Sequence, residues 1–209
     1  MSSKSANLIR QGAVGATLGG ALFVGIFTLL SLGQLGVSPA LEALEDKHWL
    51  FHIFEAPIMA LITLGVAGLY RYQAERFGKL GKLGAYLALF GFGVAALGGV
   101  AIIVVELGTG ANTAEGPLDL IVHLPSYFPF TIGSLLFGIA TLRAGLLPRA
   151  AAWVLALGGG AQLLITFSPL QGLPRLIPAV AIGLGWALLG LALLAAGTRQ
   201  ASRRQLAAA

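Results

Sequence analysis

The segment Leu83–Glu106, "LGAYLALFGFGVAALGGVAIIVVE", contains no charged residue before its last position. An α-helix rises 1.5 Å per residue, so a segment of this length covers about 36 Å and can cross the roughly 30 Å hydrocarbon core of a bilayer. In lipid every backbone polar group must be paired, and a helix pairs them within its own segment. The segment is therefore predicted to be a transmembrane helix.

Similar apolar segments recur along the rest of the chain. The sequence of 209 residues is 57% hydrophobic and 10% charged, and its mean hydropathy is +0.88. This composition is typical of membrane proteins. We predict an all-α polytopic membrane protein, a six-transmembrane-helix bundle that forms one domain over residues 1–209. The spans are expected at about 11–36, 49–70, 83–106, 119–142, 150–167 and 176–198.

The basic residues predict how the bundle is oriented. Of the 13 Lys and Arg residues, all except Lys47 and Arg175 fall at one end of the predicted spans. Because positive residues are retained on the inner side, both termini are expected to be cytoplasmic, in a multi-pass protein of the cell inner (plasma) membrane. The net charge of +5 is then a juxtamembrane fringe beside anionic lipid, and no nucleic-acid partner is expected.

The segment "KHWLFHIFEAPI", Lys47–Ile58, places ionisable residues in the outer part of the second span. His48, His52 and Glu55 share one helical face, because successive residues are separated by about 100°. Counted back from Arg71, Glu55 lies about 24 Å above the inner boundary and therefore within the apolar layer. A carboxylate at this depth is unfavourable unless it is paired or faces a cavity, so it marks a candidate functional site.

Other spans bring further polar side chains toward this level. Glu106 ends the third span, while Asp119 and His123 lie one turn apart on one face of the fourth. The candidate cluster therefore comprises His48, His52, Glu55, Glu106, Asp119 and His123, and it contains all three histidines of the chain. Deeper in the membrane, Gln162 of the fifth span is expected to form a hydrogen bond between helices.

A weak internal repeat relates two hairpins of the chain. The second span contains "HIFEAPIMALITLGVAGLYR" from His52, and the fourth contains "HLPSYFPFTIGSLLFGIATLR" from His123. Each segment starts with histidine, has proline soon afterwards and ends at arginine. A parallel repeat of this kind has its pseudo-axis along the membrane normal. It would make His52 and His123 equivalent positions.

Four interpretations of the candidate cluster are open. Its members could cap helices and hydrogen-bond to one another without a further role. They could bind a bare divalent transition metal ion, since imidazoles and carboxylates suit Zn, Fe or Cu, and the chain has no cysteine to contribute a thiolate. His52 and His123 could hold a haem b, with the acids near its propionates. Glu55 and the histidines could relay protons in a small-solute transporter.

Over residues of about 48–143, the sequence resembles the six-helix, di-haem, ascorbate-reducible cytochrome b family. The resemblance rests on the histidine that begins the second span (His52, or His48), on "GLYRYQAERFGK" with Tyr70 and Arg71, and on "LDLIVH", which delivers His123 to the fourth span. It implies a haem between these two spans on the non-cytoplasmic side, with His52 and His123 as axial ligands and His48 as an alternative. The third and fifth spans contain no histidine, so the family's ligands for a cytoplasmic haem are absent.

The predicted function is therefore the binding of haem b or of a metal ion for redox chemistry at the outer leaflet. Electron transfer across the whole membrane would then require an electron donor or other membrane subunits. The alternatives are a cofactor-free accessory subunit of a membrane complex and a small-solute transporter. The sequence shows no nucleophile-base pair, phosphate-binding loop or dinucleotide fingerprint, which leaves a soluble-type enzyme mechanism without support.

Overall fold

A computed structural model describes residues 3–34, 48–114, 116–168 and 173–208, and the regular elements of these residues are all helices. They are α1 (Ser3–Gln34), α3 (His48–Gln73), α4 (Gly78–Thr109), α5 (Pro117–Ala144), α6 (Arg149–Thr166) and α7 (Leu173–Ala208). Each contains a segment that is long and apolar enough to cross a membrane, which confirms the predicted six-helix bundle. Except for α6, the helices are longer than the predicted spans because they continue into their polar flanks.

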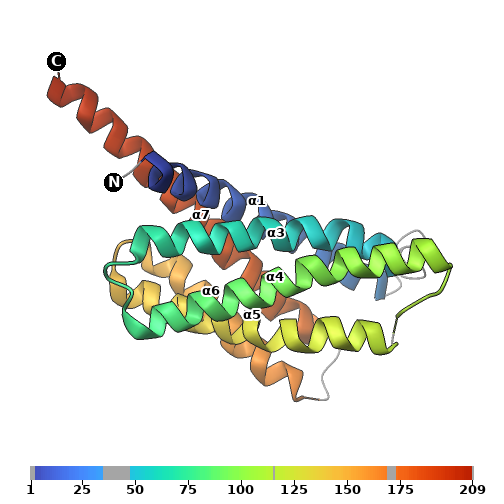
Figure 1. Cartoon of the computed structure of the whole chain (residues 1–209). Helices are drawn as coiled ribbons and strands as arrows, with labels where there is room; N and C mark the ends of the chain where they lie inside the picture. The colour runs from blue at the N-terminus through green and yellow to red at the C-terminus, as the bar shows by residue number, and fades with distance from the viewer. Residues whose placement is uncertain (1–2, 35–47, 115, 169–172, 209) are drawn as a thin grey trace.

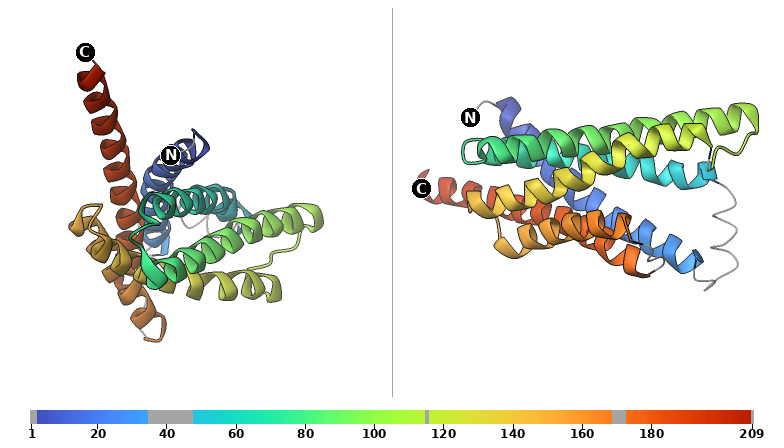
Figure 2. Two further views of the ribbon diagram at one scale, coloured as in Figure 1. Left: turned by 60° about the vertical axis from the view of Figure 1, so that its left-hand side comes forward. Right: turned by 90° about the horizontal axis from the view of Figure 1, so that it is seen from below.

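The helices form a closed ring. Each packs against its neighbours in the order α1, α3, α4, α5, α6 and α7, and α7 returns to α1. Figure 1 shows α3 between α1 and α4, and Figure 2 shows α5 beside α4. Large side chains fill the interior of the ring, and Phe92, Phe137 and Trp186 are all 0% exposed.

Glycines allow these helices to approach closely. A Cβ atom on Gly12 of α1 would lie 2.5 Å from the Cα atom of Gly68 in α3. A Cβ atom on Gly20 would lie 2.5 Å from the carbonyl oxygen of Gly183 in α7. Since lipid supplies no hydrophobic drive for helix association, close backbone packing of this kind holds the ring together.

The contact between α4 and α5 gives a test of this packing. A Cβ atom on Gly91 would lie 2.6 Å from the carbonyl oxygen of Ser126, whereas one on Gly93 would meet nothing within 4 Å. We expect Gly91→Ala to lower the free energy of unfolding by about 1–3 kcal/mol through overpacking, which corresponds to roughly 2–12 °C in melting temperature. Gly93→Ala should leave the stability unchanged or raise it slightly. Size-exclusion profiles of heated, detergent-purified protein measure both. Equal effects of the two substitutions would contradict the close contact of α4 with α5.

Apolar side chains also cover the outside of the bundle. Leu97 of α4 is 75% exposed and Leu164 of α6 is 77% exposed. Soluble monomers rarely expose apolar surface on this scale, so lipid is the natural environment for this surface. The protein is a multi-pass membrane protein.

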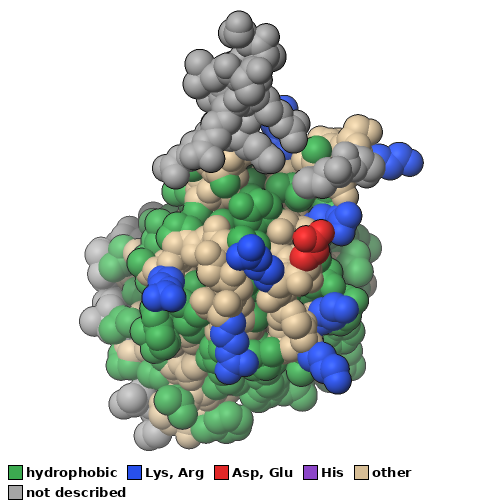
Figure 3. All heavy atoms as spheres, turned by 90° about the vertical axis from the view of Figure 1, so that its left-hand side faces the viewer, with side chains coloured by type: hydrophobic (Ala, Val, Ile, Leu, Met, Phe, Trp, Pro, Cys, Tyr) green, Lys and Arg blue, Asp and Glu red, His purple; other side chains and the backbone are tan. Residues whose placement is uncertain are grey.

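Basic side chains gather at one end of the bundle. The connections α3–α4 and α5–α6 and their immediate flanks contain Arg71, Arg76, Lys79, Arg143 and Arg149. Figure 3 shows this end, where Lys and Arg greatly outnumber acidic side chains. The start of α1 and the end of α7 lie on the same side of the molecule in Figure 1. The positive-inside rule predicts that this basic end faces the cytoplasm; the opposite end is called the outer end below.

Candidate metal centre

Helices α3 and α5 bring three ionisable side chains together near the outer end. His52 and Glu55 lie about one turn apart on α3, and His123 reaches them from α5. One ligand-type atom from each residue, an imidazole nitrogen or a carboxylate oxygen, lies within 4.8 Å of the other two. His52 is 0% exposed and Glu55 is 5% exposed, whereas the His123 side chain is 34% exposed, so the group lies at the edge of the protein interior.

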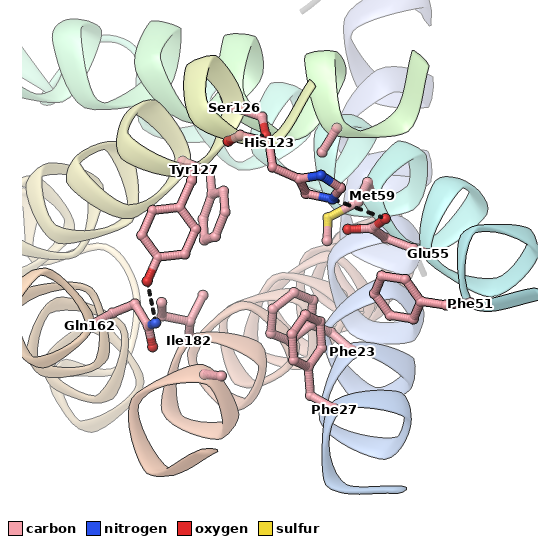
Figure 4. Close-up of a pocket in the computed structure, with 13 residues that line it drawn as sticks. Phe23, Phe27, Phe51, Glu55, Met59, His123, Ser126, Tyr127, Gln162 and Ile182 are labelled. Carbon is pink, nitrogen blue, oxygen red and sulfur yellow. Dashed lines mark hydrogen bonds and ion pairs between the residues drawn. The ribbon is translucent and has the colours of Figure 1, made fainter. Parts of the chain in front are cut away.

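A single carboxylate oxygen lies beside both imidazoles. Nδ1 of His52 donates a hydrogen bond of 2.7 Å to Oε2 of Glu55. The same oxygen lies 3.9 Å from Nε2 of His123, and Figure 4 shows these two side chains directed toward each other. The rings of His52 and His123 are 5.5 Å apart between centroids. These three residues are called the His–Glu–His group below.

Asp119 orients the His123 ring through Nδ1, the ring nitrogen that does not face Glu55. Nδ1 of His123 lies 2.8 Å from Oδ1 of Asp119 and 3.0 Å from the Asp119 carbonyl oxygen. The carbonyl oxygen can only accept a hydrogen bond, so Nδ1 carries the proton, and Nε2 is the nitrogen directed to Glu55. Histidines that bind metals generally donate their other ring N–H to a carboxylate or carbonyl in this way.

The structure thus unites three of the six residues in the predicted cluster. Asp119 contacts His123 without joining the group. Glu106 is not one of these three, and its role as a ligand stays a prediction: its Oε1 accepts hydrogen bonds of 2.6 Å from the backbone N–H and the hydroxyl of Thr113, which stabilise the α4–α5 connection. The side chain of His48 lies outside the described part of the chain.

A cavity of about 250 Å³ adjoins the His–Glu–His group, and all six helices contribute to its wall. Most of the wall is apolar or aromatic, including Phe23, Phe27 and Ile182. Glu55 and His123 lie at one side of the cavity, and Tyr127 and Gln162 lie at the other (Figure 4). Gln162 hydrogen-bonds to Tyr127, which confirms the bond between helices predicted for this glutamine.

No protein-family model, curated protein or solved structure matches the chain. The resemblance to the ascorbate-reducible cytochrome b family therefore stays a prediction. The chemistry of the site has to be judged from its geometry.

The geometry fits a single ion better than a haem. A haem between two histidines would need a slot for the porphyrin between their rings. Here Glu55 Oε2 lies against both imidazoles, and the His52 ring is enclosed by the rings of Phe51 and His123, at 5.0 and 5.5 Å between centroids. The cavity wall includes His123 but not His52. The described residues therefore leave no such slot between the two predicted axial ligands.

Proposed function

We propose that the protein binds a divalent transition metal ion through His52, Glu55 and His123. The observation that carries this proposal is the convergence of their ligand atoms, within 4.8 Å of one another, in an apolar helix bundle where His52 and Glu55 are buried. Ionisable groups are costly in such surroundings unless they are paired or coordinate a metal. Two imidazoles and one carboxylate form a ligand set that suits Zn²⁺ or Fe²⁺.

Two further features support a reactive ion over a purely structural one. Three protein ligands leave a coordination position for a small molecule, as is usual in catalytic metal sites. The cavity borders on Glu55 and His123, so a molecule in the cavity would lie beside that position. With iron this ligand set supports redox chemistry, for which a separate donor would supply electrons; with zinc it supports Lewis-acid chemistry.

The packing beneath the cavity favours a binding site over a transport path. The ring of Phe130 stacks on that of Phe92 at 5.1 Å between centroids. Trp186 contacts Phe92 at 6.0 Å and Phe137 at 4.9 Å. These four rings form an aromatic column that begins at Phe130 in the cavity wall and continues through the fully buried Phe92, Trp186 and Phe137. Such packing of large rings leaves little room for a water-filled path from the cavity through them.

The proposal is tested by the metal content of the purified protein. We expect about one Zn or Fe ion per chain after purification in mild detergent from cells supplied with trace metals and haem precursor. The double substitution His52→Ala and His123→Ala should abolish this content because it removes both imidazole ligands. Elemental analysis gives the metal, and a reduced-minus-oxidised visible spectrum of the same sample reports haem.

Three outcomes would contradict this proposal. A haem b Soret band that disappears in the double variant would favour the cytochrome-like alternative. Equal metal content in the unsubstituted protein and the double variant would show that the ion binds elsewhere. A colourless protein that remains metal-free after incubation with Zn²⁺ and Fe²⁺, and purifies with other chains, would favour the accessory-subunit alternative.

A further inference from the structure

The far side of the cavity contains a polar atom that metal binding does not use. Gln162 is only 9% exposed and lines the cavity. Among the residues that the structure describes, no donor hydrogen-bonds to its Oε1 atom. A buried acceptor without a donor costs about 1–3 kcal/mol, so Oε1 requires a partner from outside this set.

The neighbouring hydrogen bonds determine which atom of the Gln162 amide is left over. The Thr166 hydroxyl donates its one proton to the backbone carbonyl of Gln162, at 2.7 Å. The Tyr127 hydroxyl, 2.8 Å from Thr166 Oγ1, must therefore donate to Thr166. Tyr127 can then only accept from Gln162, whose Nε2 faces it. The remaining atom, Oε1, is an acceptor that needs an O–H or N–H donor.

A small movement would present this acceptor to a molecule in the cavity. Oε1 itself is covered, although the Gln162 side chain forms part of the wall. The terminal torsion of a glutamine side chain has a broad energy profile, so rotation of the amide is opposed mainly by the Nε2 hydrogen bond to Tyr127, which a hydrogen bond to the bound molecule would replace. Its second N–H would turn with it. A hydroxyl group, which both donates and accepts, matches these two atoms.

The size and walls of the cavity restrict the rest of the molecule. An apolar cavity of about 150 Å³ in another protein holds benzene, so a volume of about 250 Å³ accommodates one ring with a substituent. Phe23 and Phe27, stacked at 4.2 Å between centroids, offer an aromatic surface. The described lining residues include no lysine or arginine, and the Glu55 carboxylate is engaged by histidines. The cavity is therefore suited to a neutral molecule.

We propose that this cavity binds a small neutral molecule of the phenol class, with one aromatic ring and a hydroxyl group that donates to Gln162. The cavity borders the His–Glu–His group, but the proposed hydrogen bond lies on its opposite side and does not require a bound metal. Because its walls are largely apolar or aromatic and its polar contact lies on the side away from the metal ligands, the molecule is recognised by shape and by one hydrogen bond.

The test uses two probes of nearly equal shape, 4-fluorophenol and 4-fluorotoluene, which differ by a hydroxyl in place of a methyl group. Fluorine NMR of the full chain in detergent, with and without chelator, measures their binding. We expect Gln162→Leu to lower the affinity for 4-fluorophenol about tenfold or more and to change the affinity for 4-fluorotoluene less than about threefold. Comparing proteins with the same probe cancels its partition into micelles.

A second glutamine provides the matched control. Gln73 of α3 is 0% exposed, and its Oε1 also lacks a hydrogen-bond donor among the described residues, but Gln73 does not line the cavity. Gln73→Leu should leave both probes unaffected. Ala179→Leu, which would fill part of the cavity, should weaken both and serves as a second variant if Gln162→Leu does not fold.

Several results would overturn the proposal. They are the absence of saturable 4-fluorophenol binding, equal losses of both probes in Gln162→Leu, and undiminished binding in Ala179→Leu. Binding that disappears with chelator would assign the hydroxyl contact to the metal instead of Gln162. Because the chelated sample tests the cavity alone, failure of this proposal and failure of the metal proposal are distinguishable.

Discussion

Replacing Glu55 by glutamine should lower the affinity of the purified protein for Co²⁺ by about a hundredfold or more. Glutamine preserves the size of the side chain but removes the anionic ligand beside both histidines. Loss of a residue that only supports a metal ligand usually costs 10- to 100-fold in affinity, so the loss of a ligand should cost at least as much.

Glu106 provides a matched control for this substitution. Both glutamates are 5% exposed, and both lie near the outer end of the bundle. Glu55 contacts His52 and His123, whereas Oε1 of Glu106 accepts two hydrogen bonds from Thr113. Glu106→Gln should therefore leave Co²⁺ affinity unchanged and act, if at all, on stability.

Visible absorption of Co²⁺, read in competition with a chelator of known affinity, measures both variants. Size-exclusion profiles confirm that each variant is folded. An equal loss in the two variants would show that general acidity near the outer end attracts the ion. Unchanged affinity in Glu55→Gln would remove the carboxylate from the proposed ligand set.

The helices could be predicted from sequence because the bilayer restricts the backbone structures that a chain can adopt. A chain in lipid must pair its backbone within each segment, and the thickness of the membrane sets the length of that segment. The ends were less predictable. The third span was expected at 83–106, but α4 runs from Gly78 to Thr109. Its extra first turn contains Lys79 and Lys82, whose long side chains can reach the aqueous boundary while their backbone remains helical.

The site could be predicted only in part. The depth of a side chain in the membrane follows from its position in the sequence more directly than the direction in which the side chain points. His52 and Glu55 are three residues apart on one helix, so their contact follows from helix geometry. Glu106 lies near the same level, but the direction of its side chain depends on how the α4–α5 connection folds back, and Thr113 binds it there. The cavity has no local signal at all, because residues from six separate helices form its wall.

Replacing Trp186 by alanine should cause the largest loss of stability among the substitutions considered. Trp186 is 0% exposed and contacts the rings of Phe92 and Phe137. Its Nε1–H donates to Oγ of the buried Ser134 at 3.3 Å. Removing a buried tryptophan typically costs about 3–5 kcal/mol, which corresponds to roughly 6–20 °C in melting temperature for a chain of this size.

Trp153 is the matched control, because it is also a tryptophan but is 52% exposed on the outer surface of α6. Trp153→Ala should change stability by less than about 1 kcal/mol. Thermal unfolding in one detergent, followed by loss of the monodisperse size-exclusion peak, compares the two variants.

The comparison also bears on function. Lipid solvates an apolar side chain about as well as the protein interior does, so a large cost for Trp186→Ala must come from the weaker dispersion attraction within the interrupted aromatic column and from the lost hydrogen bond to Ser134. Equal melting of the Trp186 and Trp153 variants would contradict a tightly packed column. The barrier between the cavity and the basic end would then be weak, and the transporter alternative would regain support.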